Sequence, residues 1–110
     1  MDYANGLHLV LKRDCPTCAM VEPVVRRMVL EAAQPLYIYI QDDPAFLHSF
    51  AKIWDDTDLK HSFHLSIEAV PTLVHVQDGE EKTRVMGWDK ARWRRLTGIA
   101  DLGEELPDAR

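Results

Sequence analysis

The chain has few cysteines and no long apolar run, and each shortage excludes a class of protein. Its 110 residues include only two cysteines, too few for the disulfide framework of a small secreted domain. No apolar run approaches the roughly 20 residues that a membrane-spanning helix needs. The opening MDYANGLHLVLK lacks the basic region and the long apolar region of a secretory signal. We therefore expect a cytoplasmic protein without a membrane partner.

The chain also has fewer basic than acidic residues. Lysine and arginine total 13 against 18 acidic residues, which gives a net charge of −5 and argues against non-specific nucleic-acid binding. The length suits a single domain with its own core. We expect one domain over residues 1–102, a flexible tail over 103–110, and a monomer.

Apolar periodicity divides the chain into alternating strands and helices. Four short stretches rich in apolar and β-branched residues are predicted strands: 7–12, 36–41, 72–77 and 82–87. Three stretches have the helical spacing of apolar residues: about 15–33, 44–54 and 90–97. The remaining segment, 55–69, is polar and mixed, with room for one short helix. The order β-α-β-α-β-β-α predicts an α/β fold with helices packed on a mixed four-stranded sheet.

Both cysteines stand where the first predicted strand ends and the first helix begins, in DCPTC. Residues three apart lie on one face of a helix, so the sulfurs of Cys15 and Cys18 can meet. Cys15 falls at the helix N-terminus, where free N–H groups and the helix dipole favour a thiolate. Pro16 is tolerated there because its missing N–H would have no helical partner. Cys18 should be more buried and less acidic, so Cys15 would attack a disulfide and Cys18 would resolve the mixed disulfide.

Other interpretations of the cysteine pair stay open from the residues alone. A structural zinc site usually needs four ligands, and His61 and His64, at helix-compatible spacing, are the best candidates for a second pair. Two inert core thiols are the other alternative. A C-x-x-C motif by itself is only moderately specific.

Four features together resemble the thioredoxin family. CPTCAMVEP is similar to the family's C-x-x-C helix, with Pro23 eight residues after Cys15. SIEAVPTL resembles the segment that carries the family's cis-proline, which would be Pro71. Gly79 and Gly87 follow that proline by eight and sixteen residues, in the hairpin turn and after the last strand. The agreement at several sites is more specific than the cysteine pair alone.

The resemblance implies a thioredoxin-like fold, with helices on both faces of the sheet, and a thiol–disulfide oxidoreductase that acts as a reductant of protein disulfides. It implies Cys15 as nucleophile and Cys18 as resolving thiol. The substrate-binding residues expected beside them are Pro16, Val70, Pro71 and Thr72. Trp88 is a further expected contact on separate grounds, because exposed aromatic residues next to a catalytic groove often anchor substrates. No cofactor is required, since a separate reductase or a small thiol would supply the electrons. No metal is expected.

Departures from the family keep two further functions open. Asp14 stands where the family usually has tryptophan, and Leu9 stands where thioredoxins keep a buried carboxylate. The C-P-T-C order and the short start are closer to a minimal glutaredoxin-like core. The alternatives are therefore a binding or adaptor module with little turnover, whose dithiol could hold a metal, and a glutathione-dependent enzyme.

Overall fold

A five-stranded mixed sheet runs through the computed structural model, which describes residues 3–108. The strands are β1 Gly6–Leu11, β2 Leu36–Ile40, β3 Ile53–Asp55, β4 Thr72–Gln77 and β5 Glu80–Met86. The helices are α1 Pro16–Met20, α2 Glu22–Glu31, α3 Lys60–His64 and α4 Lys90–Thr97. The strand order is β3-β2-β1-β4-β5; β1, β2 and β3 run parallel, and β4 is antiparallel to both β1 and β5. The predicted α/β thioredoxin-like fold class is confirmed, with one strand more than expected.

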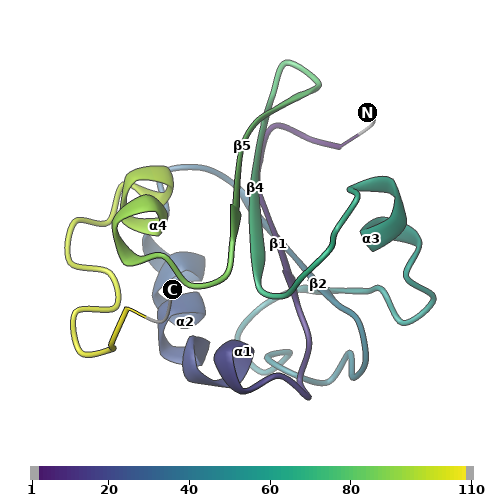
Figure 1. Ribbon diagram of the computed structural model, residues 1–110, viewed down its shortest axis with the longest axis horizontal. Helices are drawn as coiled ribbons and strands as arrows, with labels where there is room; N and C mark the ends of the chain where they lie inside the picture. The colour runs from purple at the N-terminus through teal and green to yellow at the C-terminus, as the bar shows by residue number, and fades with distance from the viewer. Residues whose placement is uncertain (1–2, 109–110) are drawn as a thin grey trace.

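Helices lie on both faces of this sheet. Helices α1, α2 and α4 lie on one side, here called the front face, and α3 lies on the other, the back face (Figure 1). The front-face core consists mainly of aliphatic residues of the sheet and of α2, together with two tryptophans near α4. A smaller cluster on the back face centres on Val10, Tyr39 and Leu65. Successive residues of β1 therefore serve different cores, because side chains alternate across a strand.

Turns and a fifth strand stand in place of a predicted helix. Residues 44–50 form turns, Leu47 has a φ of 69°, and β3 follows at 53–55. The apolar residues of this stretch have helical spacing, but β2 presents an open edge whose N–H and C=O groups require partners. β3 supplies them in parallel register, with Trp54 opposite Tyr39. The predicted helix over 44–54 is therefore wrong, and the sheet has five strands rather than four.

The first predicted helix is divided into two. Helix α1 ends at Met20 and α2 begins at Glu22; Val21 between them caps α1, with its N–H donating to Thr17 O. Pro23 lies in the first turn of α2, where a missing N–H breaks no helical hydrogen bond. The predicted limits of α4 are confirmed: the Asp89 carboxylate accepts the Arg92 N–H, and Gly98 closes the helix with a φ of 74°.

The segment after α4 returns to the domain. Gly103 is buried with a φ of 67° against the Trp88 ring, where a β-carbon would come within 2.4 Å of that ring. The Trp88 indole N–H donates to Pro107 O at 2.9 Å. Residues 109–110 of the predicted flexible tail lie outside the described residues, and the boundary at residue 102 stays a prediction. Among the described residues, no helix is long and apolar enough to cross a bilayer.

Candidate dithiol site

Cys15 caps the N-terminus of α1. Its backbone is extended, with φ −153° and ψ 112°, and its Sγ accepts the Cys18 N–H at 3.2 Å. Pro16 occupies the start of the helix and is exposed. Cys15 itself is partly exposed, so a reactant can approach its sulfur. The sulfur of Cys15 therefore accepts a hydrogen bond at the helix start, where the sequence pattern places it.

Cys18 lies one turn further on and is fully buried in the front-face core. Burial raises the pKa of its thiol, and the hydrogen bond with Cys15 raises it further. Both cysteines are free thiols. The two sulfurs thus differ in access, and the buried one has a raised pKa; stepwise thiol–disulfide exchange uses one accessible and one buried sulfur.

The loop before β4 lies beside the exposed sulfur. The Val70–Pro71 peptide bond is cis, and Val70 O is 3.8 Å from Cys15 Sγ. Pro71 is buried, and its carbonyl accepts the Gly87 N–H at 2.7 Å. The Thr72 hydroxyl donates to Ala69 O at 2.6 Å. Two hydrogen bonds therefore fix this loop against the end of β5 and against itself.

Trp88 does not belong to the exposed surface of this site. Its side chain is 1% exposed and packs edge-to-face on Trp93, with ring centroids 5.0 Å apart. The returning C-terminal segment covers it and supplies the acceptor for its N–H. The expectation of an exposed aromatic substrate contact at Trp88 is therefore wrong. Met86, opposite Thr72 in the β4–β5 ladder, is a 56% exposed apolar residue at this end of the sheet.

Asp42 is a site residue that the sequence analysis did not single out. Its Oδ1 accepts the N–H groups of Arg13 and Asp43, each at 2.8 Å, and its Oδ2 accepts the Asp14 N–H at 2.9 Å. Partial burial raises the pKa of this carboxyl, but the three N–H groups outweigh it and the pKa is lowered. The carboxylate thus holds the loop that leads into Cys15. The sequence signal for this role was an acidic residue just after the second predicted strand, since neighbouring parallel strands end at the same edge of the sheet.

The proposed zinc ligands are not assembled. His61 lies in α3 on the back face, where its Nδ1 is 3.0 Å from the Tyr3 hydroxyl, whereas Cys18 belongs to the front-face core. Within residues 3–108, no three His, Cys, Asp or Glu side chains are grouped so as to hold a metal ion. Leu9 is fully buried in the core and offers no carboxylate near Cys18.

Solved thioredoxins resemble the protein in fold at low sequence identity. The reduced Schistosoma mansoni thioredoxin pre-protein is 18% identical with a TM-score of 0.60, over 86% of this chain and 78% of its own. Nicotiana alata thioredoxin NaTrxh is 24% identical with a TM-score of 0.58, over 90% and 75% of the two chains. A mutant thioredoxin from Halobacterium salinarum is 26% identical with a TM-score of 0.55, over 84% and 73%. No family model and no curated protein matches the chain. The fold is thioredoxin-like, and its cysteine pair has C-x-x-C spacing.

Proposed function

We propose that the protein is a thiol–disulfide oxidoreductase that reduces protein disulfides through Cys15 and Cys18. The asymmetry of the two thiols carries this proposal. Cys15 is partly exposed and its sulfur accepts an N–H at a helix start, whereas Cys18 is buried with a raised pKa. Cys15 is therefore suited to attack the substrate disulfide, and Cys18 to resolve the mixed disulfide afterwards.

The reaction proceeds in two exchanges. The Cys15 thiolate attacks one sulfur of the substrate disulfide, which forms a mixed disulfide and releases the other substrate sulfur as a thiolate. Cys18 then loses its proton and attacks Cys15 Sγ, which forms the Cys15–Cys18 disulfide and releases the second substrate thiol. Two electrons pass to the substrate. An external dithiol or small thiol then reduces the internal disulfide and completes the cycle.

The surroundings favour fast attack and slower resolution. Leu9 offers no base to Cys18, so water or another group takes the Cys18 proton. Burial and the interactions with Cys15 raise the pKa of Cys18, the Asp42 charge adds to the shift, and a hydrogen bond with the Lys12 backbone opposes it. We therefore expect the resolving step to accelerate as pH rises, because a larger fraction of Cys18 is then ionised.

The substrate surface that we propose comprises Pro16, Val70 and Met86, while the buried Pro71 and Thr72 hold the loop before β4 in position. Val70 O lies beside the reactive sulfur and is an acceptor for an extended substrate segment. Exposed Met86 offers an adaptable apolar contact in place of the buried Trp88. A cytoplasmic location, a monomeric state and independence from an organic cofactor stay predictions.

The testing experiment combines a redox titration with cysteine variants. The protein is equilibrated in defined thiol–disulfide buffers, and free thiols are counted by alkylation and mass. We expect one reversible two-electron transition near the thioredoxin end of the range of about −270 to −120 mV. Cys15→Ser should abolish reduction of a model protein disulfide, and Cys18→Ser should accumulate the mixed disulfide.

Thr17→Ser is the matched control, because it changes a hydroxyl residue between the two cysteines and leaves both thiols in place. It should retain activity. Failure to form an intramolecular disulfide at any potential would overturn the proposal. A potential near −120 mV would make the protein an oxidant, and activity that requires glutathione would favour the glutaredoxin-like alternative.

A further inference from the structure

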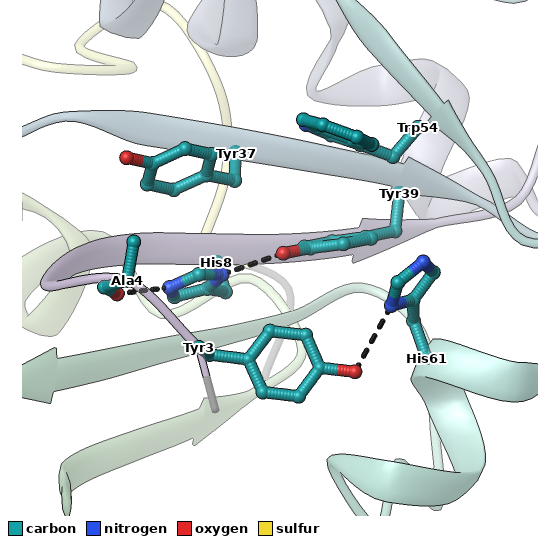
Figure 2. Close-up of a pocket in the computed structure, with 7 residues that line it drawn as sticks. All are labelled: Tyr3, Ala4, His8, Tyr37, Tyr39, Trp54 and His61. Carbon is teal, nitrogen blue, oxygen red and sulfur yellow. Dashed lines mark hydrogen bonds between the residues drawn. The ribbon is translucent and has the colours of Figure 1, made fainter. Parts of the chain in front are cut away.

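We propose that the back face of the sheet carries a binding site for a small methylated ammonium ion. A cavity of about 330 Å³ lies there, on the opposite side of the sheet from the dithiol. Six ring-bearing residues contribute to its walls: Tyr3, His8, Tyr37, Tyr39, Trp54 and His61. They come from the N-terminal segment, β1, β2, β3 and α3 (Figure 2). The proposal is independent of the redox function.

The rings hold one another in place, so the site exists before a ligand arrives. His8 stacks on Tyr37 with ring centroids 4.9 Å apart and an angle of 15° between the planes. The Tyr3 ring meets the Tyr39 ring edge-on, with centroids 6.2 Å apart. His61 closes the side nearest α3, with its ring centroid 5.0 Å from that of Tyr39. Ligand pockets are usually preformed and mainly apolar in this way.

The hydroxyls of Tyr3 and Tyr39 and both nitrogens of His8 are hydrogen-bonded within the wall. His8 Nε2 is 2.7 Å from Ala4 O, and because a carbonyl only accepts, this nitrogen carries the hydrogen. Burial lowers the pKa of His8, so at neutral pH its Nδ1 is an acceptor, and the Tyr39 hydroxyl donates to it at 2.8 Å. The Tyr3 hydroxyl pairs with His61. These bonds use both nitrogens of the buried imidazole, which leaves no nitrogen of His8 to bind an anion.

A buried negative charge stands behind the rings. Asp56 is fully buried, and its oxygens accept the N–H groups of His61 and Ser62 and the Ser62 hydroxyl. In the described part of the chain it forms no ion pair. Burial raises the pKa of Tyr3 and Tyr39, and the Asp56 charge adds to both shifts. Its potential thus reaches the cavity wall and favours a positively charged ligand over a neutral one.

One wall ring already attracts an ammonium group. Lys52 Nζ lies 4.7 Å from the centroid of the Trp54 ring, although Lys52 does not line the cavity. Ammonium groups bind aromatic faces through the ring quadrupole, and indole binds them best. A methylated nitrogen suits the remaining space, since its charge is weakly hydrated and its methyl groups bury against rings. The cavity volume is near the lower end of ligand pockets, about 300–1,000 Å³, which favours an ion the size of choline.

The test compares choline with its neutral isostere, 3,3-dimethylbutan-1-ol, in which carbon replaces the charged nitrogen. Each is titrated into the ¹⁵N-labelled protein at constant ionic strength, with sodium chloride as the blank. We expect saturable shifts at the Trp54 indole and at residues of the cavity wall, with choline binding about tenfold or more tightly than the isostere. Equal affinities would overturn the proposal, and so would the absence of shifts at these residues.

Variants then locate the site. Trp54→Leu should weaken choline binding at least about fivefold, because an aliphatic side chain has no π face. Tyr37→Phe should leave it within about twofold, because the ring is retained. Phe63→Leu is the control, since Phe63 is an 80% exposed aromatic residue in α3 that does not line the cavity. If Phe63→Leu weakened binding as much as Trp54→Leu, the cavity would not be the site. The choline–isostere comparison on the unmodified protein decides the case if a variant fails to fold.

Discussion

The two faces of the sheet are built from different chemistry, although the same strands supply both. On the front face β1 contributes Leu7, Leu9 and Leu11, all fully buried under the helices. On the back face it contributes His8, whose ring is held by hydrogen bonds and by stacking. The front is stabilised by close apolar packing, and the back depends on polar atoms that satisfy each other.

This difference explains where each site lies. The dithiol stands at the edge of the apolar face, which buries Cys18 and raises its pKa without offering a base. The cavity lies on the aromatic face, where large planar rings held by directed bonds do not fill all the space. One sheet therefore separates a place suited to sulfur chemistry from a place suited to a ligand.

Removing an aliphatic side chain from the front should have the largest effect. Leu9→Ala is expected to lower the free energy of unfolding by about 3 kcal/mol, within the usual 2–5, because it leaves a void in a dense core. Urea unfolding followed by circular dichroism measures the change. Leu30→Ala, at a side chain 79% exposed, should change it by less than about 0.5 kcal/mol. A cost below about 1 kcal/mol for Leu9→Ala would contradict the account of a tightly packed front.

The back face should be sensitive to loss of a polar group instead. Asp56→Ala removes the acceptor of two N–H groups and a hydroxyl at the start of α3. We expect a loss of about 2–3 kcal/mol in unfolding free energy, because buried donors are left without partners. Asp58→Ala, in the same loop but exposed, should cost less than about 1 kcal/mol. Equal costs for the two acids would show that burial on this face is not decisive.

Acid should weaken the back face through His8. Its pKa is lowered in the folded protein by burial, so below its ordinary value of 6.5 the unfolded chain binds a proton that the folded chain does not. Stability attributable to His8 is thus full at higher pH and is lost as pH falls below about 6.5, by at most about 1.4 kcal/mol per pH unit. Unfolding at pH 7 and pH 5 measures the loss. His8→Phe should reduce this difference, whereas His48→Gln, at an exposed site, should preserve it.

Sequence periodicity predicts most of the fold because most elements bury one regular stripe. It fails at 44–54, where helical spacing competes with the open edge of β2. In the structure the pairing of β3 with β2 wins, which sends Ile53 to the front core and Trp54 to the back face. The spacing of apolar residues within 44–54 does not reveal that β2, a dozen residues earlier in the chain, has an unpaired edge for this segment to join.

The site shows the same division between local and distant causes. The cysteine pair and its cap follow from neighbouring residues, so the sequence predicts them. The burial of Trp88 depends on Gly103 and Pro107, which return from beyond α4. The hydrogen bonds from the loop before Cys15 to the Asp42 carboxylate join groups about 28 residues apart in the sequence. Such contacts become visible only when the chain is folded.

The alternation of leucines with His8 and Val10 along β1 has a consequence for how the protein can change over generations. Substitutions act on one face at a time, so the lining of the cavity can change while the surroundings of the two cysteines are retained. An insertion of one residue within β1 behaves differently, because it would exchange every later side chain of the strand between the two faces. Lineages descended from this chain should therefore accept volume-conserving replacements in the buried strand β1 more readily than any change in its length.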